Sequence, residues 1–94
     1  MQFEWDASKE AENRTKHGID FSTVGIAWSD PHRLVFRYPG MGLDELRWQF
    51  TGYDGRGILT VRFTIRSGII RVIGAGYWRK QRGIYETKKK SRKV

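Results

Sequence analysis

Cysteine is absent from the sequence and histidine occurs only twice, which removes several kinds of functional site. Without cysteine there is no disulfide framework, no thiolate metal site and no cysteine nucleophile. Two histidines without cysteine are too few for the usual structural zinc sites, so we expect no metal site. The missing cysteine also agrees with a reducing compartment, and we expect a cytoplasmic protein.

Long apolar runs are missing as well. No stretch approaches the roughly eighteen apolar residues of a membrane span, and the N-terminus has no signal-peptide pattern. With 94 residues, of which 38% are hydrophobic, the chain suits one small domain. Four Trp, five Phe and four Tyr provide large buriable side chains, so we expect a folded domain with a modest core.

Acidic residues are scarce relative to basic ones: 10 Asp and Glu stand against 18 Lys and Arg, a formal net charge of +8. Most of the excess lies in residues 78–94, which carry eight basic residues and one acid. Such a balance indicates a polyanionic partner, namely a nucleic acid, an acidic protein or an anionic surface. Residues 88–93 contain no apolar side chain, so we expect a single domain over residues 1–87 and a disordered basic tail over 88–94.

The N-terminal third predicts a short strand and two helices. Residues 2–5 alternate polar and apolar, which favours a strand. A helix is expected over residues 7–17, with Asp6 as its N-cap and Gly18 just beyond its end. A second, short helix fits residues 22–28.

The rest of the chain predicts an antiparallel β-meander, so the expected fold class is α+β. Each of its strands alternates apolar and polar residues, as expected for a sheet with one dry and one wet face. A short helix is expected afterwards over residues 77–86. The strands are expected near residues 34–38, 45–50, 59–66 and 69–75, with turns at 39–42, 53–57 and 66–68.

The polar positions of these strands are rich in arginine, namely Arg47, Arg62, Arg66 and Arg71. If the apolar residues face the core, several of the guanidinium groups share the opposite face. Guanidinium groups pair with phosphate and aromatic side chains stack on unpaired bases, so the pattern favours RNA. Two alternatives stay open: a simply solvated sheet face, and a register that scatters the arginines over both faces.

The common enzyme motifs are missing, since there is no GxSxG, P-loop or HExxH sequence. An enzyme of this composition would have to use Arg, Lys, His, Tyr and Glu. RNA permits such chemistry because its 2′-hydroxyl is an internal nucleophile. His17 is either an acid–base group or a cation that stabilises a helix C-terminus. Glu45 is either a positioned base or an ion-pair partner of Arg47.

Two groups of residues resemble the BrnT family over residues 2–87. The N-terminal group is the more specific of the two. It comprises Phe3-Glu4-Trp5-Asp6, Lys9, Asn13, Lys16-His17-Gly18, Phe21 and Asp30-Pro31. The second comprises Glu45-x-Arg47-Trp48, Thr64-x-Arg66, Ile70-Arg71-Val72-Ile73, Arg79-Lys80 and Tyr85-Glu86.

The resemblance implies a bacterial type II toxin with a RelE-like fold: an N-terminal strand and two helices, a β-meander and a C-terminal helix. It implies a metal-independent RNA endonuclease that inhibits translation and needs no cofactor. It also implies a BrnA-like antitoxin of the ribbon-helix-helix type. Toxin and antitoxin would form a heterotetramer that contacts operator DNA only through the antitoxin.

Within this frame we predict roles for the basic and aromatic residues. In the catalytic set, Arg71 and Arg66 would hold the scissile phosphate. Arg47 or Arg79 would stabilise the charge of the transition state. The candidates for proton transfer are His17, Glu45 and Tyr85. The RNA-binding set is Arg62, Lys80, Trp78 and Arg82.

The sequence departs from the family pattern at three places. Gly76 stands where many members have a second arginine, Ile65 replaces a glutamate, and Arg56-Gly57 is inverted. Either Arg79 or Lys80 supplies the lost charge, or the chain is a weakened nuclease. The alternative function is therefore a non-catalytic module that binds an antitoxin or a nucleic acid. A general RNA-binding module of the translation machinery is a third hypothesis.

Overall fold

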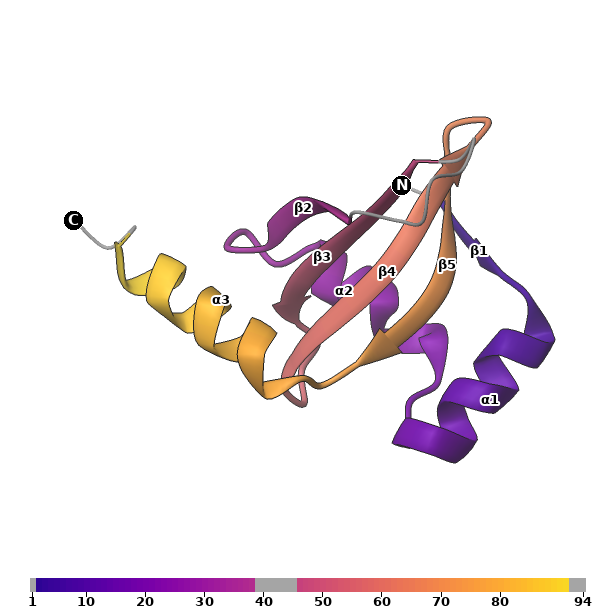
Figure 1. The fold of residues 1–94 in the computed structure, drawn as a ribbon, viewed down its shortest axis with the longest axis horizontal. Helices are drawn as coiled ribbons and strands as arrows, with labels where there is room; N and C mark the ends of the chain where they lie inside the picture. The colour runs from indigo at the N-terminus through magenta and orange to yellow at the C-terminus, as the bar shows by residue number, and fades with distance from the viewer. Residues whose placement is uncertain (1, 39–45, 92–94) are drawn as a thin grey trace.

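The computed structural model describes residues 2–38 and 46–91, and it has the α+β composition that the sequence predicts (Figure 1). Its elements alternate in type early in the chain and are mostly strands later. They are β1 (Phe3–Trp5), α1 (Ala7–His17), the 3₁₀ turn η1 (Phe21–Thr23), α2 (Val24–Trp28), β2 (Leu34–Tyr38), β3 (Arg47–Tyr53), β4 (Ile58–Arg66), β5 (Ile69–Gly76) and α3 (Arg79–Ser91).

The five strands form one mixed sheet in the order β1-β5-β4-β3-β2. Strands β2 to β5 are consecutive antiparallel neighbours, which confirms the predicted meander. Strand β1 joins the edge of β5 in parallel, a pairing that the sequence analysis did not predict. Parallel partners need a long crossover, and a three-residue strand carries no local signal for its partner.

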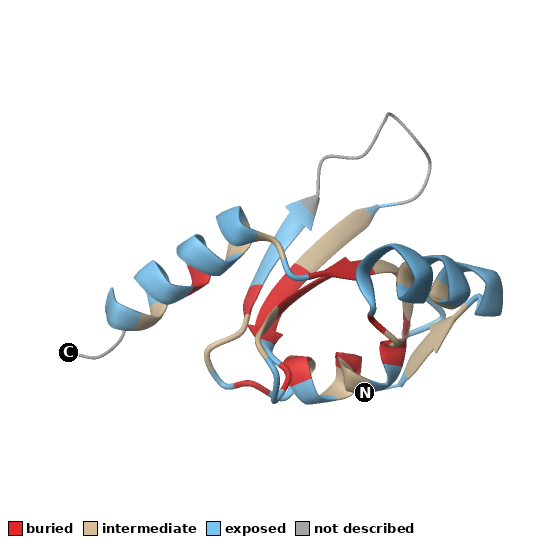
Figure 2. Cartoon of the chain, turned by 90° about the horizontal axis from the view of Figure 1, so that it is seen from below, coloured by how far each residue is buried: buried red, intermediate tan, exposed pale blue. Residues whose placement is uncertain are grey.

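One face of the sheet carries the core. The buried side chains of β3, β4 and β5 pack there against η1 and α2, as the red segments of Figure 2 indicate. Helix α2 lies so close to β3 that a Cβ added at Gly52 would be only 2.2 Å from the carbonyl oxygen of Ala27. The core comprises Ile19, Phe21, Val24, Ala27, Phe50, Leu59, Val61, Phe63, Ile70, Val72 and Ala75.

The opposite face of the sheet is flanked by α1 and α3, which lie toward opposite sides of the molecule (Figure 1). The Asn13 amide of α1 donates to the carbonyl oxygen of Ala75 in β5. Helix α3 contacts β3 and β4. Among the described residues, no helix is long and apolar enough to cross a bilayer.

The predicted ends of α1 are confirmed. The Asp6 carboxylate accepts from the backbone N–H of Ser8 at 2.8 Å, and Gly18 is left-handed with φ at 66°. The second helix differs from the prediction, because residues 21–23 form a 3₁₀ turn and only residues 24–28 are α-helical. Strand β3 extends to Tyr53 rather than residue 50, because its pairing with β4 continues to Ile58.

Helix α3 is longer than expected. It continues to Ser91, so residues 88–91 of the predicted disordered tail are helical, while residues 92–94 lie outside the described residues. Lys89 stacks its ammonium 5.9 Å from the ring centre of Tyr85, and the Ser91 hydroxyl donates to the Thr87 carbonyl oxygen. Lysines near a helix C-terminus are also stabilised by the helix dipole. A domain boundary at residue 87 stays a prediction.

The close approach of α2 to β3 predicts that Gly52→Ala destabilises the fold. The new methyl group would displace the Ala27 carbonyl, and overpacking of this kind costs about 1–3 kcal/mol of unfolding free energy. The matched control is Gly83→Ala in α3, where an added Cβ meets nothing within 4 Å. That change should stabilise the protein by about 0.5–1 kcal/mol. Urea unfolding measures both, and equal stability of the two variants would contradict the packing argument.

Candidate functional site

The four arginines of β3, β4 and β5 lie on the sheet face opposite the core. In β4, Leu59, Val61 and Phe63 are buried in the core, so the alternate positions point the other way. The register with β3 and β5 carries this alternation to the neighbouring strands, across a bulge between Arg62 and Phe63. The prediction that the arginines share a face is thereby confirmed. We call this surface, with Arg47, Arg62, Arg66 and Arg71, the arginine face.

One row of residues crosses the centre of this face. Arg47 of β3 pairs with Thr64 of β4, and Thr64 pairs with Arg71 of β5. Because neighbouring strands lie about 4.8 Å apart, the backbones of the two arginines are about 10 Å apart. Thr64 is buried and its hydroxyl donates to the Leu46 carbonyl oxygen at 2.8 Å. The two long cationic side chains therefore start on either side of the buried Thr64.

The row ends at Glu4 of β1, which pairs with Arg71. The Glu4 carboxylate lies 3.4 Å from Nη1 of Arg71, and the two side chains are 41% and 31% exposed. The Arg71 charge also helps to lower the pKa of Asp6, although the hydrogen bonds from Ser8 are the larger cause. Arg71 is thus a solvent-accessible cation that pairs with Glu4 and acts electrostatically on Asp6.

A second cluster lies on the same face around Trp78. The Arg62 guanidinium carbon lies 4.9 Å from the centre of the indole, and the His17 ring meets the indole edge-on at 6.2 Å between ring centres. A Cβ added at Gly76 would lie 2.5 Å from the indole ring. Gly76 therefore provides the space in which Trp78 packs on the sheet. Three of the predicted site residues, Arg62, Trp78 and His17, meet in this cluster.

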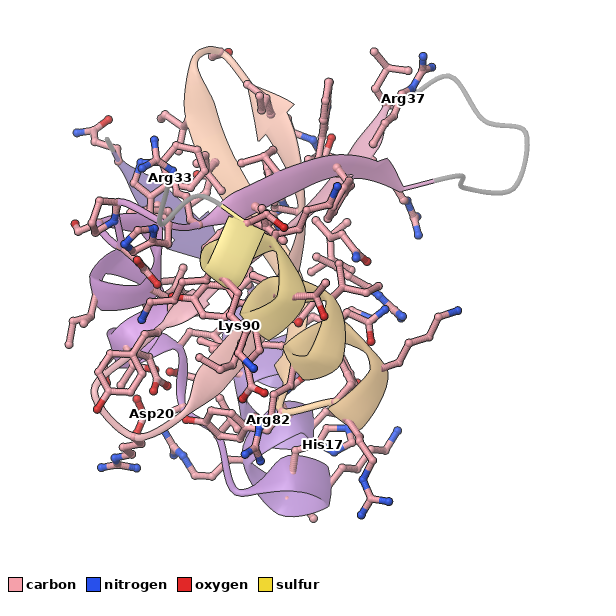
Figure 3. All side chains as sticks on the ribbon, turned by 90° about the vertical axis from the view of Figure 1, so that its left-hand side faces the viewer. His17, Asp20, Arg33, Arg37, Arg82 and Lys90 are labelled. Carbon is pink, nitrogen blue, oxygen red and sulfur yellow. The ribbon has the colours of Figure 1, made fainter. Side chains whose placement is uncertain are left out.

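Helix α3 brings further cations to the border of the arginine face. Lys80 lines a hollow of about 230 Å³ together with Gln49 and Thr51 of β3. Arg79 is exposed, and Arg82 is paired with Glu86 at 3.0 Å one turn along the helix. Arg82 and Lys90, labelled in Figure 3, are both exposed on this helix.

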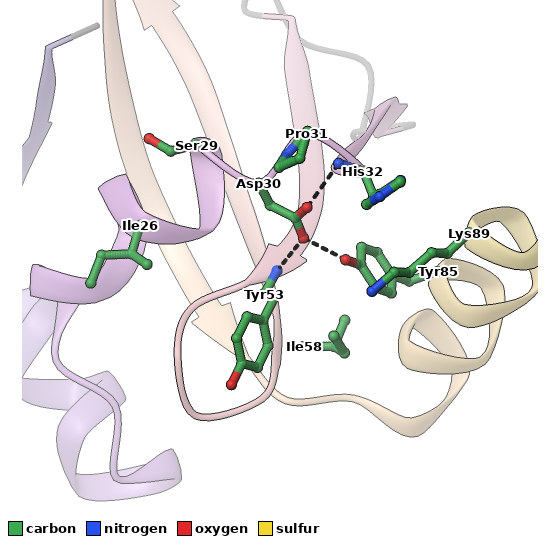
Figure 4. A pocket seen from close by; sticks show the side chains of 9 residues that line it. All are labelled: Ile26, Ser29, Asp30, Pro31, His32, Tyr53, Ile58, Tyr85 and Lys89. Carbon is green, nitrogen blue, oxygen red and sulfur yellow. Dashed lines mark hydrogen bonds between the residues drawn. The ribbon is translucent and has the colours of Figure 1, made fainter. Parts of the chain in front are cut away.

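Tyr85 lies elsewhere, in a pocket of about 350 Å³ between α2, the β3–β4 hairpin and α3 (Figure 4). It is only 2% exposed, and its hydroxyl donates to the carboxylate of Asp30. The same carboxylate accepts from the backbone N–H groups of Tyr53 and His32, both at 2.8 Å. Asp30, to which the sequence analysis gave no site role, therefore fixes α3 to the body of the protein.

Burial and hydrogen bonding act in opposite directions on the pKa of Asp30. Burial would raise this pKa, but the three hydrogen bonds from Tyr85, Tyr53 and His32 hold it below its ordinary value. The carboxylate is therefore ionised at neutral pH. Its donors come from the segment before β2, from the end of β3 and from α3, so the carboxylate acts as an anchor that joins them.

A second aspartate–tyrosine pair anchors the segment before α3. Asp54 is 2% exposed and accepts from Tyr77 Oη and from the backbone N–H groups of Arg56 and Gly57. Burial, and then the hydrogen bond to Asp54, raise the pKa of Tyr77 to about 12. The tyrosine hydroxyl thus remains a donor over the whole physiological range.

The predicted site residues therefore fall into three groups. The strand arginines, Trp78 and His17 gather on or beside the arginine face, and the α3 cations border it. Tyr85 is buried at the Asp30 anchor, and Glu45 lies outside the described residues. Sequence reasoning did not select Glu4, because only the parallel pairing of β1 with β5 brings it to Arg71. Among the described residues, no group of three or more Asp, Glu or His side chains could hold a metal ion.

Comparison with known proteins gives one match. A family model described as the ribonuclease toxin BrnT of type II toxin–antitoxin systems matches residues 5–81, which include every strand except the first two residues of β1. No curated protein matches the chain significantly.

The Asp30 anchor predicts that Tyr85→Phe destabilises the protein by about 1.5–3 kcal/mol at pH 7, the usual range for a hydrogen bond to a charged group. The pKa of Asp30 is lowered on folding, so this contribution is present above the unfolded pKa and declines as the pH falls below it. Urea unfolding at pH 7 and pH 3 should thus show a larger loss at pH 7. Tyr53→Phe is the control, because its exposed hydroxyl donates only to the Gly55 carbonyl oxygen. Equal effects of the two variants would contradict the anchor.

Proposed function

The chain belongs to the BrnT family of type II toxin–antitoxin ribonuclease toxins, and from this premise we propose that the arginine face is where it binds and cleaves RNA. The observation that carries the proposal is the central row, in which Arg47 and Arg71 flank the buried Thr64. A phosphate above Thr64 would be within reach of both guanidinium groups. Guanidinium binds phosphate in a fork of two hydrogen bonds, which fixes its orientation as well as its charge.

Trp78 supports recognition of an unpaired base beside that phosphate. Its indole is half-buried on the sheet, next to the Arg62 guanidinium. Aromatic rings with nearby cations are the usual platforms for single-stranded bases. Arg62, Lys80 and Arg82 would extend the backbone contacts toward α3.

The missing arginine at Gly76 has a structural counterpart in this arrangement. Any side chain at position 76 would collide with the Trp78 indole. Gly76 and Trp78 therefore form a matched pair, and Arg62 holds its cation against that indole. This supports a rearranged site in preference to a simple loss of one functional group.

The proposed reaction is metal-independent cleavage within the RNA chain. The 2′-hydroxyl attacks the adjacent phosphorus and the 5′-oxygen leaves, which gives a 2′,3′-cyclic phosphate. In this scheme Arg71 and Arg66 hold the scissile phosphate, while Arg47 or Arg79 stabilises the charge that develops on it. Of the two proton-transfer candidates that the structure describes, His17 and Tyr85, it is His17 that lies beside the arginine face, through its contact with Trp78.

The remaining proposals rest on the family. A type II toxin has an antitoxin, and we propose a BrnA-like ribbon-helix-helix partner in a heterotetramer that binds operator DNA through the antitoxin alone. We further propose a RelE-like fold, translational arrest as the consequence of cleavage, and the cytoplasm as the place of action. The five-stranded sheet with flanking helices is consistent with that fold.

A non-catalytic binding module remains the second candidate function. The observation in its favour is the engagement of Arg71 by Glu4, which would weaken a simple phosphate anchor. Such a module would bind RNA without cleaving it, and its expression without an antitoxin would be tolerated by the cell.

The first prediction concerns Arg71. Incubation of purified protein with end-labelled single-stranded RNA in EDTA should yield fragments that end in a 2′,3′-cyclic phosphate. Arg71→Ala should slow cleavage by about 10²–10³-fold, since it removes a transition-state contact. Arg14→Ala is the control of equal charge, because Arg14 is an exposed residue of α1 paired with Glu10. An Arg71→Ala protein that cleaves like the wild type would exclude the assigned role, and an inactive wild type would favour the binding module.

The second prediction concerns Trp78. Trp78→Ala should weaken binding of single-stranded RNA by about 1–3 kcal/mol, the usual loss for one stacked base. Trp78→Phe keeps an aromatic plane and should retain most of the affinity. Filter binding with an uncleavable 2′-O-methyl RNA measures both variants. Equal losses for the alanine and phenylalanine variants would show that stacking is not the source of the affinity.

A further inference from the structure

The sheet contains a single acidic side chain among its described residues. Glu4 of β1 has this position, and all the other charged residues of the five strands are arginines. Its neighbours Phe3 and Trp5 pack against the core, so Glu4 points to the arginine face. The one carboxylate of the sheet therefore lies at the end of the row that contains Arg71, Thr64 and Arg47.

Stabilisation of the fold is a weak explanation for this carboxylate. The ion pair with Arg71 has one contact of 3.4 Å, and both side chains are about one-third exposed or more. Exposed ion pairs of this kind contribute about 0–1 kcal/mol to stability. Glu4 thus keeps an accessible carboxylate in a place where the fold gains little from it.

The geometry also allows Arg71 to hold two anions at once. A guanidinium group has five N–H donors in a planar fork, and Glu4 engages only Nη1. Its remaining donors have no partner within the described parts of the chain, and a phosphate group could accept from them. A phosphate bound there would sit beside the Glu4 carboxylate, since the same guanidinium touches both.

On the premise of the proposed RNA cleavage, we propose that Glu4 is a catalytic residue: the acceptor of the proton from the attacking 2′-hydroxyl. As the bond between O2′ and phosphorus forms, the 2′-hydroxyl proton moves to the Glu4 carboxylate. The bond between phosphorus and O5′ breaks, and the 5′-oxygen takes a proton from solvent. Glu4 later returns its proton to solvent, so no oxidant, reductant or further reactant is needed.

The Arg71 guanidinium explains why the carboxylate is tolerated on this face. It lies between Glu4 and the substrate phosphate, so its charge screens their repulsion and holds the carboxylate in one orientation. Glu4 and His17 occupy different parts of the face, because His17 contacts Trp78 and Glu4 contacts Arg71. In this proposal the proton acceptor Glu4 lies in the row of side chains that would bind the phosphate. His17 lies in the cluster around Trp78, which would stack on a base.

The test compares Glu4→Gln with wild type in single-turnover cleavage of end-labelled single-stranded RNA at saturating protein. Loss of a general base should slow cleavage by about 10²–10⁴-fold. Binding of the same RNA carrying 2′-O-methyl groups should be unchanged or tighter, because a negative charge has been removed. Glu4→Asp should restore part of the rate. Glu12→Gln removes the same charge from an exposed position of α1 and should cleave at the wild-type rate.

Three results would overturn the assignment. Wild-type cleavage by Glu4→Gln would exclude any catalytic part for Glu4. Parallel losses of rate and of 2′-O-methyl RNA affinity would make Glu4 a positioning residue for Arg71. Recovery of Glu4→Gln on RNA with a 5′-sulfur leaving group, which needs no proton, would make Glu4 a proton donor instead of an acceptor.

Failure of the proposed function gives a different pattern. If the wild type binds the RNA but does not cleave it, both the ribonuclease site and the role of Glu4 are wrong. If the wild type cleaves and Glu4→Gln cleaves equally, only the role of Glu4 is wrong. Urea unfolding of Glu4→Gln and Glu4→Asp is the folding control. A variant that had lost the β1–β5 pairing would unfold at a lower urea concentration than the wild type.

Discussion

The alternation of β4 is the constraint on which the rest of the structure depends. Leu59, Val61 and Phe63 lose their contact with water by packing against α2 and η1, and this burial fixes which way the strand faces. A slip of one residue would expose these side chains and bury Arg62. The hydrophobic core therefore determines the position of the arginines, although it contains none of them. The bulge at Arg62 and Phe63 preserves this arrangement across the pairing with β5.

The two buried aspartates extend this organisation to the C-terminal helix. Asp30 holds Tyr85 of α3, and Asp54 holds Tyr77 of the segment that leads into it. Asp30 also accepts backbone N–H groups from His32 and from the end of β3, and Asp54 accepts two from its own turn. The tyrosine hydroxyls are therefore what join each aspartate to a distant segment of the chain. Helix α3 is strongly basic, and a helix of like charges has little tendency to pack by itself. Its two anchors place that charge next to the sheet, where it can add to the field of the strand arginines.

The arginine face carries two separate groups of charged and aromatic side chains. Trp78, Arg62 and His17 form one cluster in the space that Gly76 leaves, and they suit a base and its backbone. Arg71 and Glu4 form a different pair, in which a cation and a carboxylate meet at the sheet edge. Under the proposed function, the first cluster would bind a base and the second would act on the phosphate next to it.

The sequence alone determined the local features, because these depend on neighbours in the chain. The Asp6 cap, the Gly18 end of α1, the meander and the shared face of the arginines all follow from periodicity and turn residues, and the N-terminal motif indicated the family. Tertiary structure decided what depends on distant contacts. It paired β1 with β5 and so placed Glu4 beside Arg71, and it buried Tyr85 on Asp30, away from the arginine face. It also packed Trp78 into the space of Gly76 and continued α3 to Ser91. No local pattern encodes these outcomes, because each needs two segments that meet only when the sheet has formed.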